Sequence, residues 1–461
     1  MMRASSALFS LAVVAVAACA AYSEPRDVAT YDLEFCVAED MISDELGYGV
    51  GSGSTVTPAP VAGGRVRAEP QFASDEPFRG YVIIQGSGKT TMVLAALDAS
   101  RGGGPPYDRL YVDANGDRDL RNDPVIKATK LVTKDSGYIY SYFRPVMLKL
   151  PPEGGRSYAV AIYSYYLEHC PNHPEGHSYV RARSACYYEG RARFGDEERR
   201  VVLMDRDCNG LFNERNPANL SSPTSSGGDE ILILPDADEP VELTGGLLSQ
   251  AIPLGRYVGV GDRFYQIRPA TDGSSVQVHN RHVPTGPLHV EANGEYRLRF
   301  GSEDGPVVVQ SRGPEARLPI GTYTLGKQAI VATDIEGRVW VVETYPSLRP
   351  TTRVLTPVGF SLPGGGTARR TAPAEPARST ANDLAVTADS GPTIPAFGPP
   401  LVLDVTASVR DEEVSIGLSV TGERGDRIRS VLVDGSTPPA PVFQILSAGG
   451  KVIAEDQFEY G

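Results

Sequence analysis

The chain has little histidine, cysteine or tryptophan, and it lacks an excess of positive charge. It contains 6 histidines, 5 cysteines and 1 tryptophan among 461 residues. Asp and Glu outnumber Lys and Arg by 57 to 44, which gives a formal net charge of −13. Because an acidic chain repels phosphate backbones and anionic headgroups, we expect neither nucleic acid nor an anionic membrane surface as a partner.

Long apolar runs are missing beyond the N-terminus, and few stretches are free of helix-breaking residues. The 49 glycines and 37 prolines punctuate the chain at the spacing of short strands joined by turns. The length is that of roughly two to four domains, and 41% apolar residues suffice for their cores. We therefore predict a mainly β fold of several domains, built from antiparallel sheets or β-sandwiches.

The N-terminus has the pattern of an export signal. Arg3 precedes an apolar stretch from Ala7 to Ala18, which is too short to span a bilayer easily. The residues from Val16 to Cys19 resemble a bacterial lipobox, in which Cys19 is acylated. Cleavage by an ordinary signal peptidase near Cys19 is the alternative. We predict export to the periplasm or cell surface, with membrane contact only through a lipid on Cys19.

Composition along the chain predicts six segments. Runs rich in Gly, Ser, Pro, Ala and Thr bury too little apolar surface to fold alone, and they separate strand-rich regions. The segments are a signal peptide (1–19), a weakly ordered N-terminal segment (20–65), a β domain (66–235), a second β domain (236–362), a low-complexity linker (363–396) and a small immunoglobulin-like β-sandwich (397–461).

Four cysteines remain if Cys19 carries a lipid. An exported protein meets oxidising conditions, so an even number permits disulfides. Cys170 and Cys186 are the nearest pair in sequence, and we predict a disulfide between them.

The segment Gly86-Ser87-Gly88-Lys89-Thr90-Thr91 has the look of a phosphate-binding loop. Such a loop opens with a glycine several residues ahead of the lysine, and here that position is Ile83. The apolar run that follows is also too short for the expected helix before the Gly102–Pro106 stretch ends it. We interpret the segment as the turn of a β-hairpin.

Oxygen-bearing side chains recur at alternate positions where an apolar strand ends at Met204. Spacing of two along a tight loop directs successive oxygens to one point, and Ca²⁺ prefers six to eight oxygen ligands. Gly210 occupies position six, but Asn216 at position twelve lacks the usual carboxylate. The predicted ligands here are Asp205, Asp207, Asn209, Leu211 (through its carbonyl) and Asn213.

The same pattern follows the strand that ends at Val112. Arg118 stands at position six in place of glycine, and Asp123 lies one residue before position twelve. The predicted ligands of this loop are Asp113, Asn115, Asp117 and Asp119. A further acidic patch, Asp229-Glu230 with 236–239, can contribute ligands, although its spacing is not diagnostic. The alternative is that both loops are solvated Asp/Asn/Gly turns.

These two loops resemble the calcium loops of dockerins and EF-hand proteins over about a dozen residues each. The resemblance implies the ligand geometry and not the helices, since strands precede both loops. As a whole the chain resembles a loose group of uncharacterised exported bacterial β-rich proteins. This resemblance depends on the loop 110–117, on its repeat near the chain centre and on the ending Phe458–Gly461. It supports a surface or periplasmic location and no catalytic activity.

Two other clusters, one of histidines with a cysteine and one of tyrosines, could each form a binding site. His169, Cys170, His173 and His177 offer zinc-type ligands, but Pro and Gly between them exclude a helix, so a polar loop is the simpler interpretation. The tyrosines between 138 and 188 suit either a sugar-stacking face or an ordinary sheet surface.

We predict a calcium-stabilised cell-envelope protein with a structural, adhesive or binding role toward another envelope protein or a glycan. The alternative is an exported metal-dependent hydrolase that uses the loop 169–177.

Overall fold

The structure is a computed structural model in which regular elements are strands throughout the described part of the chain. All strand pairs except β20–β27 are antiparallel, which confirms the mainly β class. Within the same part of the chain, no helix is long and apolar enough to cross a membrane. The described residues are 28–38, 54–58, 66–86, 89–133, 138–150, 156–167, 177–215, 228–235, 243, 247, 250–292, 294–344, 383–398, 401–410, 413–422, 426–434, 437–447 and 449–458.

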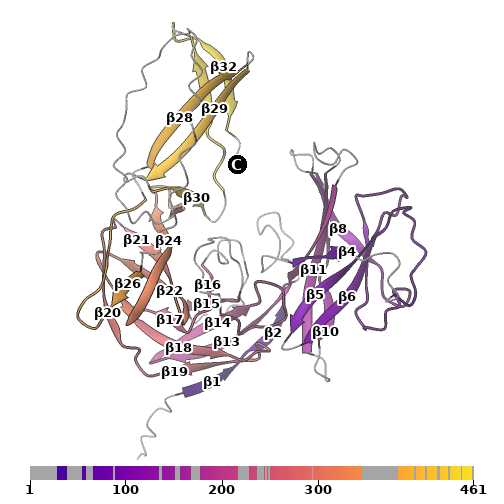
Figure 1. Cartoon of the computed structure of the whole chain (residues 1–461), viewed down its shortest axis with the longest axis horizontal. Helices are drawn as coiled ribbons and strands as arrows, with labels where there is room; N and C mark the ends of the chain where they lie inside the picture. Colours follow the sequence, from indigo (N-terminus) through magenta and orange to yellow (C-terminus); the bar gives the residue numbers. More distant parts are fainter. Residues whose placement is uncertain are drawn as a thin grey trace, which may run out of the picture.

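The largest sheet has ten strands, which lie at the right of Figure 1 in indigo to purple. The order is β3-β12-β11-β9-β8-β7-β6-β5-β4, with β10 paired to β11 beside this path. Burial alternates along β10, as expected where one face covers a core. The strands are β3 (Ser54–Thr55), β4 (Thr57–Pro58), β5 (Phe78–Gly86), β6 (Lys89–Asp98), β7 (Arg109–Val112), β8 (Ile126–Thr133), β9 (Tyr138–Phe143), β10 (Val146–Leu150), β11 (Arg156–Leu167) and β12 (His177–Ser184).

The segment that imitates a phosphate-binding loop joins β5 to β6. These two strands pair antiparallel from Phe78–Leu97 to Gly86–Lys89. A phosphate-binding loop requires a helix after the glycines, and β6 occupies that place. The hairpin interpretation is therefore confirmed.

Two sheets form the middle of the molecule, in the orders β16-β15-β14-β13-β2 and β1-β19-β18-β17. β13 and β14 form a hairpin, and Gly195 in its turn has a φ of 63°. The strands are β1 (Val28–Asp32), β2 (Glu34–Val37), β13 (Cys186–Phe194), β14 (Glu197–Met204), β15 (Glu230–Pro235), β16 (Ile252–Pro253), β17 (Tyr257–Val260), β18 (Arg263–Pro269) and β19 (Ser275–His279).

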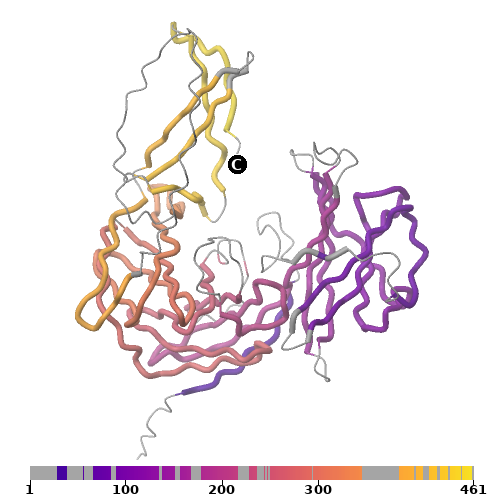
Figure 2. The backbone as a smooth tube through the Cα atoms, viewed as in Figure 1, coloured from indigo at the N-terminus to yellow at the C-terminus, as the bar shows by residue number. Residues whose placement is uncertain are grey.

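Residues 28–38 belong to these two sheets and are not a weakly ordered segment. β1 pairs with β19 and β2 pairs with β13, so one short stretch joins both sheets. Figure 2 shows this indigo segment running along strands that come much later in the chain. Leu33 is buried between the two strands, and the ring of Phe35 meets that of Tyr188 edge to face at 5.6 Å. Apolar burial against distant strands therefore orders this segment.

One hydrophobic core crosses the predicted domain boundary at residue 235. It joins residues of the ten-stranded sheet, such as Val160, to Leu203 of β14 and to Ile267 and Val278 of the neighbouring sheet. A second core lies further along and includes Leu298. The first structural unit thus continues past residue 235 to about β19.

The second core is covered by the sheet β22-β21-β24-β25-β30, to which β26 adds beside β24, and by the sheet β23-β20-β27. The strands are β20 (Thr285–Val290), β21 (Glu295–Ser302), β22 (Gly305–Arg312), β23 (Glu315–Pro319), β24 (Gly321–Thr333), β25 (Val339–Thr344), β26 (Asp383–Val386), β27 (Thr393–Ile394) and β30 (Ile428–Val433).

β26 and β27 lie inside the predicted linker. β26 pairs with β24, and β27 pairs in parallel with β20. Val386 and Ile394 are buried in the second core, with exposed fractions of 2% and 0%. The end of the linker prediction, from residue 383, is therefore wrong, because two apolar side chains in a polar stretch suffice to attach it. Residues 363–382 lie outside the described part of the chain.

The C-terminal residues form two hairpins, which project upward in Figure 1. The hairpins are β28 (Leu401–Arg410) with β29 (Glu413–Gly422), and β31 (Val442–Leu446) with β32 (Val452–Gln457). Leu403 and Ile453 are 65% and 67% exposed. Between the hairpins in sequence, β30 pairs with β25 of the preceding sheet instead. The antiparallel pairs expected of a small sandwich are present, but β30 joins them to the second core.

Cys186 is a free thiol that is fully buried at the start of β13. The backbone N–H of Ala159 lies 3.4 Å from its sulfur. The predicted disulfide with Cys170 is therefore wrong, because the Cys186 thiol is free and packs in the hydrophobic core. Cys170 itself lies outside the described residues.

Candidate metal centre

The loop after β14 begins with a fully buried carboxylate. Asp205 is 0% exposed, and three donors hold it. The Tyr158 hydroxyl donates to Oδ2 at 2.7 Å, as does the backbone N–H of Gly210. The backbone N–H of Asn209 donates to Oδ1 at 3.2 Å. Asp205 therefore shapes the loop around itself, which is the role of the first position in calcium loops.

Gly210 is needed for this shape. Its φ is 81°, in the left-handed region that disfavours side chains. A Cβ at this position would lie 2.8 Å from Ile84 and 2.9 Å from Leu150. The loop is thus packed against the ten-stranded sheet as well as turned sharply.

Strand pairing brings Asp229 to this loop. β14 pairs with β15 up to Met204–Glu230. The next position along the two antiparallel strands places Asp205 opposite Asp229. Like charges directly opposite one another destabilise a sheet unless something neutralises them. Asp229 is 0% exposed, so water does not screen it.

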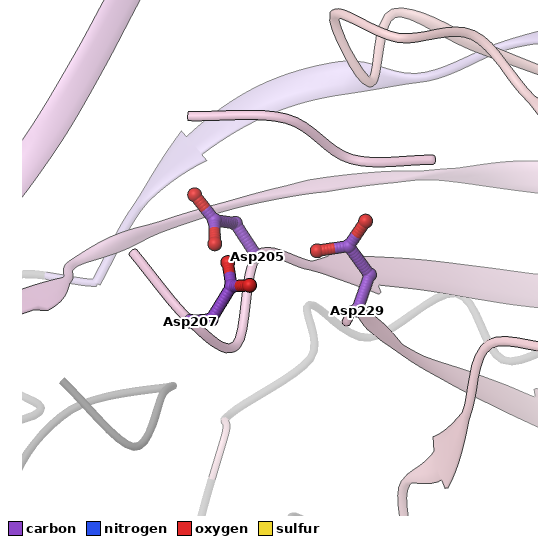
Figure 3. A group of neighbouring side chains, drawn as sticks. All are labelled: Asp205, Asp207 and Asp229. Atoms are coloured by element: carbon purple, nitrogen blue, oxygen red, sulfur yellow. The ribbon is translucent and has the colours of Figure 1, made fainter. Parts of the chain in front are cut away.

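Asp205, Asp207 and Asp229 converge, as Figure 3 shows. One carboxylate oxygen from each lies within 4.8 Å of the others. Two oxygens bound on opposite sides of one Ca²⁺ are separated by about the same distance, since each Ca–O bond is roughly 2.4 Å. The three carboxylates can therefore hold a single metal ion.

Two oxygens of this group have no hydrogen-bond partner although they are buried. They are Oδ1 of Asp207 and Oδ1 of Asp229. The second oxygen of Asp229 accepts from the backbone N–H of Glu214 at 2.6 Å. An unpartnered buried carboxylate oxygen is costly, and a cation is the partner that removes the cost.

The pKa values of Asp205 and Asp229 reflect the burial of these carboxyl groups close to one another without a cation. Burial, together with the charge of Asp205, raises the pKa of Asp229 to about 10. Burial also raises the pKa of Asp205, against the hydrogen bond from Tyr158 that lowers it. Without a metal, Asp229 is therefore protonated at neutral pH, and a bound cation would displace its proton.

A fourth carboxylate borders the group. Burial raises the pKa of Glu214, and the charge of Asp207 raises it further. The Asn209 side-chain amide donates to Glu214. Glu214 stands at position ten of the loop, where the dockerin pattern expects no ligand, so sequence spacing alone did not identify it.

The loop after β7 has the same local backbone as the loop after β14. Positions four and six have positive φ in both: Gly116 (78°) and Arg118 (65°) in the first, Cys208 (60°) and Gly210 (81°) in the second. In both, the carboxylate at position one accepts the backbone N–H of position six, and position five accepts that of position seven. The shared sequence pattern therefore encodes one shared turn.

The first loop does not bring three carboxylates together as closely as the second. Asp113 and Asp123 are buried, and Asp113 Oδ1 and Asp123 Oδ2 have no hydrogen-bond partner. Burial raises the pKa of Asp123, and Asp113 raises it further. Asp119, however, pairs with the Arg121 guanidinium at 2.7 Å, which competes with a metal. Asn115 and Asp117 are exposed.

Of the nine predicted ligands, two belong to the converging group. Asp205 and Asp207 are joined there by Asp229, which the sequence marked only as part of an acidic patch. Asn213 donates to the Thr271 hydroxyl at 2.9 Å, and the Asn209 side-chain oxygen accepts from Leu211 N–H at 2.7 Å. Metal binding by the nine predicted residues, in both loops, stays a prediction.

The donor set consists of hard oxygens. Zinc prefers imidazole and thiolate, whereas calcium and magnesium prefer carboxylates and carbonyls. Burial holds the pKa of the nearby Cys208 thiol well above its ordinary value, so it stays protonated and is a poor ligand. His169, Cys170 and His173 lie outside the described residues, and His177 begins β12.

The tyrosines of β9, β11 and β12 form a ladder across the sheet. The ring of Tyr165 stacks on Tyr140 at 5.5 Å and on Tyr179 at 4.8 Å. Tyr142 stacks on Tyr163 at 6.1 Å. These rings cover one another's faces, whereas sugar stacking needs exposed ring faces. The ordinary sheet-surface interpretation is therefore favoured.

Comparison with protein-family models, with curated proteins and with solved structures finds no match to this chain.

Proposed function

We propose that the chain is an exported cell-envelope protein that calcium stabilises, with a structural or binding role. The observation that carries the proposal is the convergence of Asp205, Asp207 and Asp229, two of which have an unpartnered buried oxygen. A bound Ca²⁺ would neutralise these charges and fasten the end of β14 to the start of β15. Such a site supports a fold and needs no reactive group.

The export part of the proposal depends on the N-terminal pattern. Labelling of cells with a fatty acid tests it directly. We expect the wild type to carry label in the membrane fraction, whereas Cys19→Ala is unlabelled and is released on cell fractionation. Equal labelling of both, or retention of both in the cytoplasm, contradicts this part.

Calcium binding is tested on the purified mature chain by thermal unfolding with Ca²⁺, with Mg²⁺ and with chelator. A ligand that binds only the native state stabilises it by RT ln(1 + [L]/Kd). With a Kd on the order of 10⁻⁴ M, as in extracellular calcium modules, about 10 mM Ca²⁺ adds about 2.7 kcal/mol. We expect a higher Tm with Ca²⁺ than with Mg²⁺ or chelator.

Asp207→Asn should remove most of this calcium-dependent shift. Asp262→Asn is a matched control, because the Asp262 side chain is 94% exposed and lies away from the group. Identical melting curves in Ca²⁺ and chelator, or an equal shift in wild type and Asp207→Asn, would refute the calcium site.

A further inference from the structure

The connection from β7 to β8 contains two buried carboxylates, one at its start and one near its end. Asp113 is 5% exposed and Asp123 is 8% exposed. The backbone N–H of Asp113 donates to the Leu94 carbonyl of β6 at 2.9 Å, which fixes the start of this loop to the ten-stranded sheet. The N–H of the next residue, Ala114, donates to Asp123 Oδ1 at 3.3 Å, so the two ends of the loop come together.

Each of these two carboxylates has one oxygen that accepts a hydrogen bond and one that does not. Asp113 Oδ2 accepts from the backbone N–H of Arg118 at 3.1 Å, but Oδ1 has no hydrogen-bond partner among the described residues. Asp123 Oδ1 accepts from Ala114, but Oδ2 has no such partner. Both of these oxygens are buried, so bulk water does not take the place of a donor, and each has a desolvation cost.

A buried aspartate on the adjoining strand shows that burial alone does not leave such oxygens. Asp98, the last residue of β6, is fully buried, yet its Oδ1 accepts the N–H of Ser74 at 2.8 Å and its Oδ2 accepts that of Ala73 at 3.1 Å. The Arg109 guanidinium also lies 3.5 Å from Oδ2. Asp98 thus has the full set of donors expected of a structural carboxylate, which the two loop carboxylates lack.

We propose that Asp113 and Asp123 hold a second cation, Ca²⁺, in the loop after β7. A hard cation would provide both unpartnered oxygens with the partner that they lack, and loop carbonyls and water would complete its coordination. These ligands differ from those that the sequence predicts, because Asp119 pairs with Arg121 and Asp123 takes its place. The inference does not depend on the calcium proposal for the loop after β14, since the two sites share no residue.

A cation in this loop would also secure an earlier part of the chain. The Arg118 carbonyl accepts the N–H of Arg67 at 2.8 Å, and the Leu120 N–H donates to the Ala68 carbonyl at 3.0 Å. The loop therefore holds residues 67–68 in place. Binding of a cation to the closed loop should make local opening of both segments less frequent.

Hydrogen exchange of the full mature chain, followed by mass spectrometry, tests the proposal with Ca²⁺ as the probe and chelator as the reference. At a Ca²⁺ concentration about ten times the Kd, exchange in residues 113–123 and 67–68 of the wild type should slow about tenfold. Asp123→Asn should lose this protection, whereas Asp207→Asn, in the loop after β14, should keep it. Asp262→Asn is the matched control, because its side chain is 94% exposed; it should behave as the wild type does.

Equilibrium dialysis with radioactive calcium counts the sites in the same proteins. Loss of one site in Asp123→Asn, with this site retained in Asp207→Asn, supports the proposal whether or not the loop after β14 binds calcium. Exchange of residues 113–123 that does not respond to Ca²⁺ in the wild type, or equal protection in Asp123→Asn, overturns it. Should Asp123→Asn fail to fold, Asp113→Asn is judged by the same comparison.

Discussion

At the scale of single residues, Asp229 is the clearest case of a buried side chain whose effect on the free energy of unfolding depends on a bound cation. It is fully buried, it lies opposite Asp205 across the strand pair, and one of its oxygens has no partner. The same features that make Asp229 unfavourable without a cation make it a good ligand with one. Its contribution to stability should therefore change sign with the metal.

We predict that Asp229→Asn has opposite effects in chelator and in calcium. Without metal, burial forces Asp229 to take up a proton at neutral pH, which costs stability relative to the ionised unfolded chain. The amide removes this cost, so the variant should be as stable as the wild type or more stable. With calcium, the wild type should gain stability and the variant should gain little. Urea unfolding under both conditions measures the two differences. A variant that is less stable than the wild type by the same amount in both conditions would assign Asp229 a purely structural role.

At the scale of elements, the β24–β25 hairpin contains the only tryptophan of the chain, Trp340, near the start of β25. Trp340 Nε1 donates to Asp334 Oδ2 at 2.8 Å, and Arg338 Nε lies 2.8 Å from the same carboxylate. These hydrogen bonds lower the pKa of Asp334 to about 2. Because the folded pKa is below the ordinary value of about 4, the stabilisation is present above pH 4 and is lost as pH falls through about 2.

We predict that Trp340 emission titrates near pH 2 in the wild type. Asp334→Ala should lack this transition and should show the altered emission already at pH 7. Far-ultraviolet circular dichroism recorded in parallel separates the local change from unfolding. A transition that coincides with loss of strand signal in both proteins would contradict the local assignment.

The short strand β27 is the second element whose role can be tested. Ile394 is fully buried in the second core. Truncation to Ala should cost about 2–5 kcal/mol of the free energy of unfolding. Leu403→Ala, at a side chain that is 65% exposed, should change it by less than about 0.5 kcal/mol. If Ile394→Ala left the free energy of unfolding unchanged, the segment around β27 would behave as the linker that the sequence predicts.

At the scale of the whole molecule, the first core determines which part of the chain can fold alone. It joins Leu33, the ten-stranded sheet, β14 and residues as late as Val278. A chain that stops at the predicted boundary of 235 leaves the faces that pack against Ile267 and Val276 uncovered. We therefore expect the continuity of this core, and not the composition of the sequence near residue 235, to determine which fragment folds on its own.

We predict that a fragment of residues 20–282 unfolds cooperatively on heating, whereas a fragment of residues 20–235 does not. Circular dichroism and calorimetric melting of both fragments provide the measurement. A cooperative transition in the shorter fragment would show that the boundary at 235 separates two independent cores after all.

Local patterns in the sequence determined the β class, the hairpin β5–β6 and the common turn of the two Asp-rich loops. Each depends on residues within about a dozen positions, such as the alternating oxygens at Asp205 and Asp207 or the glycine at position 210. Local chemistry suffices there, because hydrogen bonds between near neighbours define the structure.

Only the tertiary structure decided which distant segments meet. β1 and β2 find their partners at β19 and β13, and β27 finds its partner at β20. Asp229 reaches Asp205 through strand register. The physical reason is that a sheet joins strands irrespective of their separation in sequence, and no pattern within one strand records which strand will pair with it.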